Sequence, residues 1–270
     1  MTLETTERNF GRFKIVPVAE VKTGTAVGLY GPPGAGKTTL AGTLATYDPF
    51  CPICVVDAEG GTKVLNDYTN IDVIPVANWK DVEELRVEFQ KKVGTPDAPW
   101  KTIIIDNLSE FMSMVIFAKF GTQQLTQPNW GEVQRAMIDQ IRFYRDLARD
   151  KGINVVFIAW DVEDKSPSGR IKNQMNFIPS LQNTIPGLLD YVGHITVLPN
   201  GHRQITFATD PQKNVAKFRR NATDIAQQIP LTIEYDLAHQ PLVDIMRTLG
   251  EGVPWPTAKY NTSKAATQTQ

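Results

Sequence analysis

Cysteine, histidine and long hydrophobic runs are scarce in this 270-residue sequence. Its two cysteines, Cys51 and Cys54, lie in one Cys-Pro-Ile-Cys turn, and the three histidines are far from that turn in the sequence. A zinc site would need further ligands, so we interpret the pair as ordinary thiols rather than as a metal or redox centre. No apolar run approaches the roughly 18 residues of a membrane span, and the first residues lack a basic signal-like region. We therefore expect a soluble, cytoplasmic protein with no membrane partner.

Net charge is also small, because 28 lysines and arginines oppose 29 acids and leave a formal charge of −1 at pH 7. This sum alone does not indicate a nucleic-acid-binding protein. The distribution is uneven, however: residues 48–88 contain nine acids and three bases, whereas residues 165–220 contain eight bases and two acids. Segment 165–220 therefore predicts one basic surface.

A glycine-rich motif occupies residues 31–38, which read Gly-Pro-Pro-Gly-Ala-Gly-Lys-Thr and match the pattern G-x-x-x-x-G-K-[ST]. The apolar run before it, residues 25–30, predicts a buried strand, and residues 38–46 after it predict a helix. Backbone N–H groups of such a loop and of the helix start bind phosphate oxygens. A glycine-rich turn that binds nothing is the less favoured alternative.

The motif assigns individual roles within this loop. Lys37 would reach the β- and γ-phosphates, and the Thr38 hydroxyl would bind Mg²⁺. ATP and Mg²⁺ are thus the expected cofactors. The predicted nucleotide-binding residues are Gly31, Pro32, Pro33, Gly34, Ala35, Gly36, Lys37, Thr38 and Thr39.

Strand-like apolar runs alternate with helical periodicities along the chain, which predicts an α/β fold with a mostly parallel, twisted sheet and helices on both faces. Further strands are expected at residues 53–57, 72–76, 102–106, 154–159 and 194–198. Apolar stripes predict helices within residues 82–93 and 133–148. Residues 203–209 follow a Pro-Asn-Gly-His turn and predict a hairpin at the far end of the sheet, while residues 162–176 predict a loop.

One domain with appendages is the simplest division of this chain. We expect an N-terminal arm, a nucleotide-binding core and a C-terminal extension at residues 1–20, 21–220 and 221–256. The polar residues 257–270 predict a disordered tail.

Two acids complete a predicted catalytic site. Asp106 ends the apolar strand 102–106 and is the Walker B acid, the second group expected to hold Mg²⁺. Asn107 follows it and cannot act as a base at neutral pH, so the base must come from elsewhere. Glu59 follows the neighbouring strand, and carboxyl ends of parallel strands converge on one crevice, so Glu59 is the predicted water-activating base. A solvated turn acid is the alternative for Glu59.

This order of motifs resembles the RecA recombinase family, and in particular the phage RecA-like ATPases of the Sak type (the fourth Sak family), from about Phe10 to about Arg220. The resemblance implies a RecA-like P-loop NTPase fold, with Lys37 and Thr38 as loop residues, Glu59 as the catalytic glutamate and Asp106 as the Walker B acid. It also implies a DNA-stimulated ATPase that forms a filament or ring and acts on single-stranded DNA in phage recombination, by annealing or strand pairing, in the host cytoplasm. A single-stranded DNA-binding protein is a further implied partner.

The chain departs from this family at the end of its fourth strand, where a polar γ-phosphate sensor is common. Here the sequence reads Ala159-Trp160-Asp161, and the Trp160 indole can only donate a hydrogen bond. Either Asp161 takes over sensing or the switch is weaker. Core packing is an equally good interpretation of the Trp160 ring.

Residues 210–220 resemble the basic element that, in RecA-like proteins, reaches the nucleotide of the neighbouring subunit. The resemblance implies a charge supplied in trans by Lys213, Lys217 or Arg219, of which Lys217 and Arg219 are the predicted catalytic residues. A solvated basic strand edge is the alternative.

Single-stranded DNA is expected to bind the basic loop through Lys165, Arg170 and Lys172, with stacking on Phe177. A plain solvated loop is the alternative. Two other functions remain open: a nucleotide-switched assembly or loading factor that never contacts DNA, and a small-molecule kinase, which is disfavoured because the sequence has no arginine-rich lid.

Overall fold

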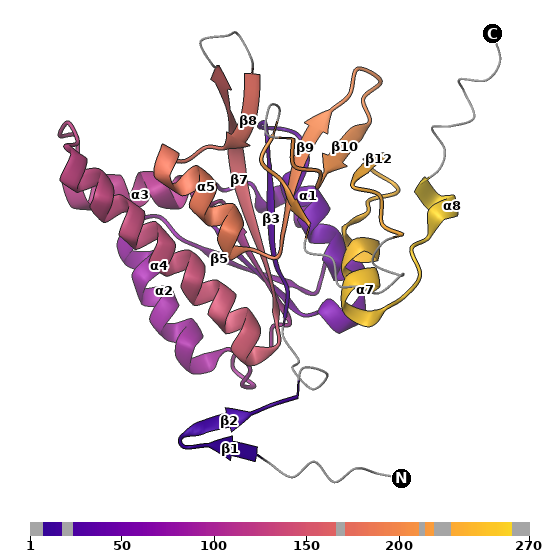
Figure 1. The fold of residues 1–270 in the computed structure, drawn as a ribbon, viewed down its shortest axis with the longest axis horizontal. Coiled ribbons are helices and arrows are strands. Elements are labelled where there is room, and N and C mark those ends of the chain that lie inside the picture. The colour runs from indigo at the N-terminus through magenta and orange to yellow at the C-terminus, as the bar shows by residue number, and fades with distance from the viewer. Residues whose placement is uncertain (1–7, 18–23, 166–170, 211–213, 219–227, 261–270) are drawn as a thin grey trace.

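The computed structural model describes residues 8–17, 24–165, 171–210, 214–218 and 228–260. Strand β1 (Arg8–Phe10) and strand β2 (Phe13–Ile15) pair as an antiparallel hairpin. This hairpin lies below the main body of the molecule in Figure 1. Among the described helices, none is long and apolar enough to cross a membrane.

A ten-stranded sheet forms the centre of the molecule, with the main strand order β12-β10-β9-β3-β7-β6-β4-β5. Its six neighbouring strands from β9 to β5 are parallel. These strands are β9 (Tyr191–Val197), β3 (Ala26–Gly31), β7 (Asn154–Lys165), β6 (Thr102–Asp106), β4 (Ile53–Asp57) and β5 (Ile71–Pro75). The antiparallel strands are β10 (Arg203–Thr206), β12 (Thr232–Tyr235), β8 (Ile171–Met175) and β11 (Lys217–Phe218).

Helices cover both faces of this sheet (Figure 1). One face carries α2 (Trp79–Lys92), α3 (Leu108–Phe120), α4 (Gln127–Lys151) and α5 (Pro179–Leu188). The other carries α1 (Lys37–Gly42) and α7 (Leu242–Glu251), while α8 (Thr257–Tyr260) lies beyond α7. The prediction of a mostly parallel α/β sheet between two helical layers is therefore confirmed.

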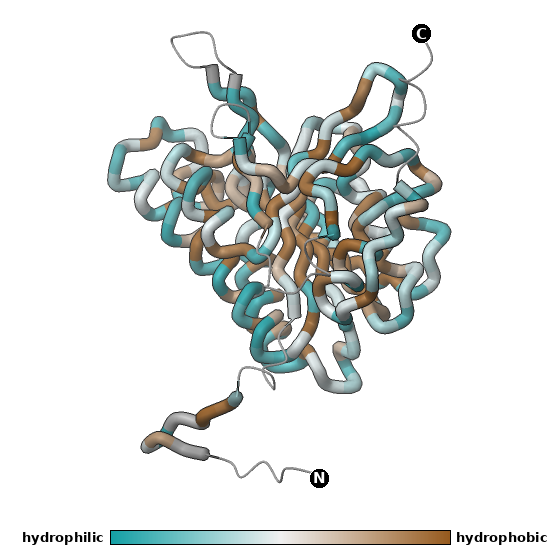
Figure 2. The backbone as a smooth tube through the Cα atoms, turned by 45° about the vertical axis from the view of Figure 1, so that its right-hand side comes forward, coloured by the Kyte–Doolittle hydropathy of each residue, from teal (hydrophilic) through white to brown (hydrophobic). Residues whose placement is uncertain are grey.

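Strand β6 shows why its sequence specifies a central strand. All five of its residues are buried, as expected where helices cover both faces of a parallel sheet. Side chains alternate between the faces, so Ile103 and Ile105 join the core under α2 to α5 and Ile104 joins the core under α1 and α7. Figure 2 shows the resulting hydrophobic centre within more hydrophilic helices.

Strands β4 and β6 have the predicted bounds, and the hairpin of β9 and β10 is present. The helix expected at 38–46 is divided, because α1 ends at Gly42 and a 3₁₀ helix follows at Thr43–Thr46. The loop prediction for residues 162–176 is wrong, since β7 runs on to Lys165 and pairs with β8. Polar residues suit this two-stranded ribbon, which projects beyond the helical layers in Figure 1, so it lacks the apolar alternation of a core strand.

The C-terminal part is more integrated than its predicted division suggests. Strand β12 pairs with β10 and extends the central sheet, so residues within the expected extension 221–256 belong to the core sheet. Within the expected tail, Thr257–Tyr260 form α8, where the Tyr260 ring stacks on Trp255 at 4.9 Å between ring centroids. The rest of the predicted tail lies outside the described residues.

Candidate nucleotide-binding site

The phosphate-loop motif connects the end of β3 to the start of α1. Gly34 and Gly36 adopt φ angles of +76° and +85°, in the left-handed region that disfavours side chains, so the loop needs glycine at both positions. Gly36 caps α1 without a side-chain hydrogen bond, which leaves the first-turn N–H groups available to an anion. The loop thus joins a buried parallel strand to a helix start, as in the α/β fold of P-loop NTPases.

Lys37 is the cation at the base of this loop. Its side chain is 7% exposed, and its ammonium donates hydrogen bonds to the carbonyls of Gly31 and Pro32, both at 2.9 Å. Burial lowers the pKa of Lys37, while the carboxylates of Glu59 and Asp106 act in the opposite direction. The lysine therefore lies within the electrostatic field of both predicted catalytic acids.

Thr38 and Asp106 are brought together as predicted for a Mg²⁺ site. The Thr38 hydroxyl donates to Asp106 Oδ2 at 2.6 Å. Asp106 is 2% exposed, and its Oδ1 atom is buried without a hydrogen-bond partner among the described residues. An orphaned carboxylate oxygen beside a hydroxyl suits Mg²⁺, which prefers oxygen ligands and takes few from protein when substrate phosphates supply others.

Burial raises the pKa of the Asp106 carboxyl to about 6, an effect that the Thr38 hydrogen bond opposes. A metal ion must displace that proton, so Mg²⁺-dependent nucleotide binding should strengthen as pH rises from about 5 to about 7. The pH dependence of stability without metal runs in the opposite direction. The folded chain holds this proton more tightly than the unfolded chain, so the free energy of unfolding falls as pH rises through about 6.

Calorimetric titration with Mg²⁺-ADP across this pH range measures the effect. The matched variant Asp106→Asn should bind more weakly and lose the pH dependence centred at about 6, because it carries no titrating carboxyl. A parent protein whose Mg²⁺-dependent affinity stays flat over the range would contradict the metal-side role of Asp106.

Glu59 faces the same pocket, and Asn107 holds it there. Asn107 Nδ2 donates a hydrogen bond to Glu59 Oε2, and Asn107 Oδ1 accepts one from the Glu110 N–H in the first turn of α3 at 2.9 Å. The sequence alone indicates only that Asn107 cannot act as a base. The structure shows that its amide both caps α3 and orients the predicted base.

The turn that carries Glu59 is shaped by Asp57 at the end of β4. Its carboxylate accepts hydrogen bonds from the N–H groups of Glu59 and Gly60 at 3.1 and 2.7 Å and from the Thr62 hydroxyl at 2.8 Å. A side chain that bonds the backbone two and three residues on fixes a tight turn. The position of Glu59 therefore depends on the turn fixed by Asp57 and on its hydrogen bond from Asn107.

Trp160 and Asp161 lie beside this pocket at the point where β7 leaves the central sheet. Trp160 lines the pocket, and its backbone N–H donates to the Ser109 hydroxyl at 3.1 Å. Asp161 Oδ2 lies 3.5 Å from Nε2 of the buried His194, whose ring stacks on Tyr30 at 4.6 Å between centroids. The Asp161 carboxylate is thus in contact with the His194 ring, which packs against β3, the strand that leads into the phosphate loop.

Two predicted site residues have other roles in the structure. The Lys217 ammonium donates to the carbonyls of Pro186, Gly187 and Leu189 at 3.1, 3.0 and 2.5 Å, so it satisfies the C-terminal end of α5 in its own chain. This position corrects the prediction that Lys217 reaches a neighbouring subunit. Phe177 is 4% exposed within the hydrophobic core and is not placed to stack on a base, which corrects its predicted DNA contact.

The remaining basic candidates are only partly described. The backbone of Lys165 ends β7, and Lys172 lies opposite Asp164 in the ribbon of β7 and β8. Arg170, Lys213 and Arg219 lie outside the described residues. Their roles stay predictions.

Arg203, the first residue of β10, is not among the site residues that the sequence predicts. Its side chain lines the same pocket as Lys37 and Asp106, and its Nε donates to the Ala35 carbonyl at 3.1 Å. No motif marks an arginine 167 residues after Gly36 in the chain as a neighbour of the loop. Only the pairing of β10 with β9, beside β3, brings it there.

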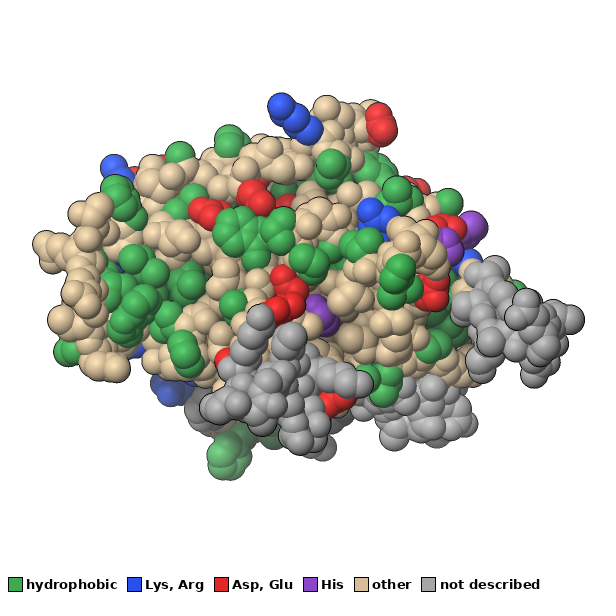
Figure 3. Space-filling view, turned by 90° about the horizontal axis from the view of Figure 1, so that it is seen from above, with side chains coloured by type: hydrophobic (Ala, Val, Ile, Leu, Met, Phe, Trp, Pro, Cys, Tyr) green, Lys and Arg blue, Asp and Glu red, His purple; other side chains and the backbone are tan. Residues whose placement is uncertain are grey.

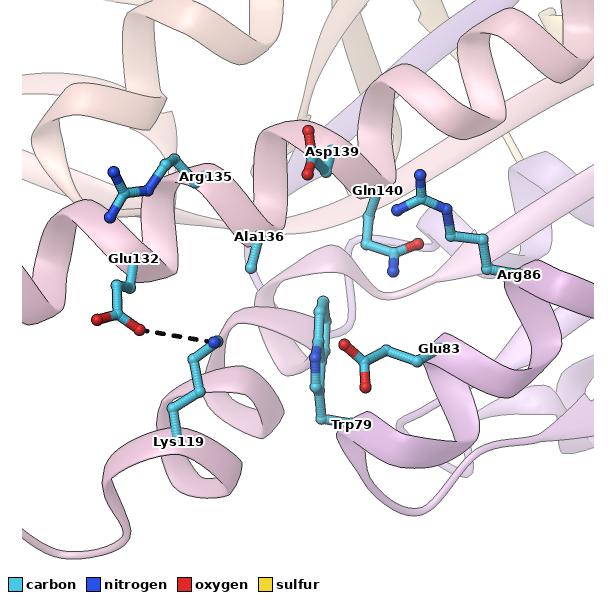
Figure 4. Close-up of a pocket in the computed structure, with 9 residues that line it drawn as sticks. All are labelled: Trp79, Glu83, Arg86, Lys119, Glu132, Arg135, Ala136, Asp139 and Gln140. Atoms are coloured by element: carbon cyan, nitrogen blue, oxygen red, sulfur yellow. Dashed lines mark ion pairs between the residues drawn. The ribbon is translucent and has the colours of Figure 1, made fainter.

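A larger hollow among α2, α3 and α4 is shown in Figure 4. Its volume is about 560 Å³, against about 260 Å³ at the phosphate loop. Its charged lining residues are Glu83, Glu132, Asp139, Arg86, Lys119 and Arg135. Acids and bases balance there, and Lys119 pairs with Glu132 at 3.6 Å, so the hollow offers no surplus charge to a phosphate despite its size.

Comparison with known proteins places these residues in a family. Residues 23–220 match the profile of the family described as AAA domain, a range that contains the phosphate loop, Glu59, Asp106 and Arg203. No curated protein matches the sequence. Solved structures that match include the crystal structure of the RadB recombinase, with 16% sequence identity, a TM-score of 0.46 and coverage of 69% of this chain and 81% of that chain.

Proposed function

We propose, because the chain belongs to the AAA domain family, that it binds Mg²⁺-ATP at the phosphate loop and hydrolyses it to ADP and phosphate. One observation carries this proposal: Lys37, Thr38, Glu59 and Asp106, from three separate segments, line one pocket. A turn that bound nothing would not need a buried lysine, an orphaned carboxylate oxygen and a carboxylate held by an amide.

Each residue has a task in this reaction. Lys37 neutralises charge on the phosphates, and Thr38 and Asp106 hold the Mg²⁺ ion that, when bound, screens the phosphate oxygens. The Glu59 carboxylate accepts the proton of the attacking water, and Asn107 keeps that carboxylate directed into the pocket. These groups are present within one chain.

The proposed cellular task is action on single-stranded DNA in phage recombination, by annealing or strand pairing, as a RecA-like protein that forms a filament or ring in the host cytoplasm. The motif order supports this, as does a physical link between the pocket and the ribbon of β7 and β8. The Tyr30 hydroxyl on β3 donates to the Val215 carbonyl at 2.8 Å, makes a longer contact of 3.3 Å with the Asn173 carbonyl of β8, and accepts from the Val215 N–H at 3.2 Å. Strand β3 therefore connects the phosphate loop, where the nucleotide is proposed to bind, to the ribbon. Arg219 is the proposed trans residue, and a single-stranded DNA-binding protein is a proposed partner.

A loading factor that switches a protein contact is the second candidate, and the acidic side chains among the described residues at this end of the molecule favour it. Figure 3 views the molecule from that end, where acidic side chains gather near the middle and basic ones are scattered. Glu163 and Asp164 are exposed on β7 itself. A DNA-binding surface at this end would need basic residues near these two acids, and Lys172 is one of them.

Stimulation of ATP hydrolysis by single-stranded DNA distinguishes the two candidates. We expect DNA to raise turnover severalfold, and Lys172→Gln to weaken DNA binding and flatten its salt dependence by about 0.7 log units for each phosphate that the variant no longer neutralises. Lys119→Gln, on α3, is the control and should leave both unchanged. ATP turnover that ignores DNA, with equal salt slopes for all three proteins, would favour the loading factor.

A further inference from the structure

Arg203 is a cation in the pocket to which the proposed hydrolysis assigns no role. It begins β10, where its backbone pairs with Val197 of β9 and Tyr235 of β12. The strand pairings on both sides fix the position of its Cα atom, while the hydrogen bond from Nε to the Ala35 carbonyl, at 3.1 Å, fixes the guanidinium group. The guanidinium is therefore held against the phosphate loop by the sheet of its own chain.

The loop is built to admit this side chain. A Cβ atom on Gly36 would lie 2.9 Å from Arg203 Nε and 3.6 Å from Cζ, so the absence of a side chain at Gly36 leaves the space that the guanidinium occupies. Gly36 has a second reason to be glycine, its φ of +85°. Arginine and loop thus fit together in one arrangement.

The N–H groups on the two terminal nitrogens of Arg203 are available as hydrogen-bond donors. Within the described part of the chain, its hydrogen bond to Ala35 uses only Nε, and no carboxylate lies within ion-pair distance of the guanidinium. An arginine carries five N–H donors in a planar fork suited to phosphate oxygens. Its position at the wall of the pocket lets the remaining donors face a bound nucleotide.

The position along the loop indicates which phosphates it would meet. The Lys37 ammonium lies against Gly31 and Pro32 at the start of the loop, whereas Arg203 lies against Ala35 and Gly36 where the loop enters α1. In phosphate loops, the lysine reaches the β- and γ-phosphates and the backbone N–H groups cradle the α- and β-phosphates. Arg203 is therefore placed beside the phosphates that ADP and ATP share.

We infer that Arg203 is a nucleotide-binding residue that contacts the α/β-diphosphate from within the same chain. The inference rests on the proposed nucleotide binding and adds a residue to that site. It differs from an arginine supplied by a neighbour to the transferring phosphoryl group, because a contact made equally before and during reaction raises affinity and leaves turnover at saturation unchanged.

The test compares Arg203→Gln with the parent by calorimetric titration with ADP and with a non-hydrolysable ATP analogue, followed by steady-state ATP hydrolysis. We expect both affinities to fall by a similar factor of about ten to a hundred, with a raised KM and an unchanged kcat. Arg203→Lys should recover part of the affinity, since it restores charge without the planar fork. Gln204→Ala is the control, because the next residue of a strand points to the opposite face of the sheet.

Thermal unfolding without nucleotide shows whether the variants are folded, and the increase of Tm on adding ADP should be smaller in Arg203→Gln. Parent-like affinity in Arg203→Gln would overturn the inference, and so would a loss confined to kcat, which would assign Arg203 to the transition state. Either result would leave the proposed function intact provided that the parent binds ADP. A folded parent that bound neither nucleotide would overturn the proposed function and this inference together.

Discussion

Alanine in place of Lys37 should abolish ATP hydrolysis, with turnover reduced by about three orders of magnitude. The ammonium is buried at the base of the loop, where charge on a phosphate is stabilised more strongly than in water. Alanine removes this charge, and the Gly31 and Pro32 carbonyls lose their partner. Phosphate release measured at saturating Mg²⁺-ATP gives the effect.

A matched control separates loss of chemistry from loss of folding. Lys80→Ala removes a lysine from the exposed side of α2, where it pairs with Glu84, and should hydrolyse ATP like the parent. Circular dichroism of both variants should match that of the parent. Turnover by folded Lys37→Ala within a few-fold of the parent value would show that the loop is not the site of hydrolysis.

Replacement of Glu59 by glutamine should leave nucleotide binding intact and slow hydrolysis by about a hundredfold to ten-thousandfold. The amide keeps the shape of the carboxylate, and its oxygen still accepts the hydrogen bond from Asn107, but it cannot take a proton from water. Titration with ADP and single-turnover hydrolysis of ATP measure the two effects separately.

Glu110→Gln is the matched control, because Glu110 lies near the same amide in the first turn of α3 but is not the residue proposed to activate the attacking water. It should hydrolyse ATP at close to the parent rate. The opposite pattern, a slow Glu110→Gln and an unaffected Glu59→Gln, would transfer the role of base to Glu110.

The sequence predicts the centre of the fold well for a physical reason. Strands β4 and β6 are buried on both faces, so their apolar runs are continuous, and each run ends at an acid, Asp57 or Asp106. Asp106 could therefore be identified from the strand that precedes it. The phosphate loop is local as well, since its glycines, lysine and threonine are contiguous.

Elements without a clear period were missed. Helix α3 is apolar over most of its surface and shows no stripe, and α5 contains Pro186, a residue that argues against a helix interior. Long-range contacts were missed for another reason. The pairing of Asn107 with Glu59 and the approach of Arg203 to Ala35 depend on which strands are neighbours, and no local pattern encodes that order.

The side-chain amide of Asn107 connects helix α3 to Glu59, the proposed base. It serves as the cap of α3, an interaction that typically stabilises a helix by about 1 kcal/mol, and the same side chain restrains Glu59. The base can then move away from the pocket only if it separates from Asn107 or draws the beginning of α3 with it. A ligand that displaced α3 would therefore also displace the Glu59 carboxylate through this one side chain, and in the proposed reaction such a shift should change the rate of hydrolysis.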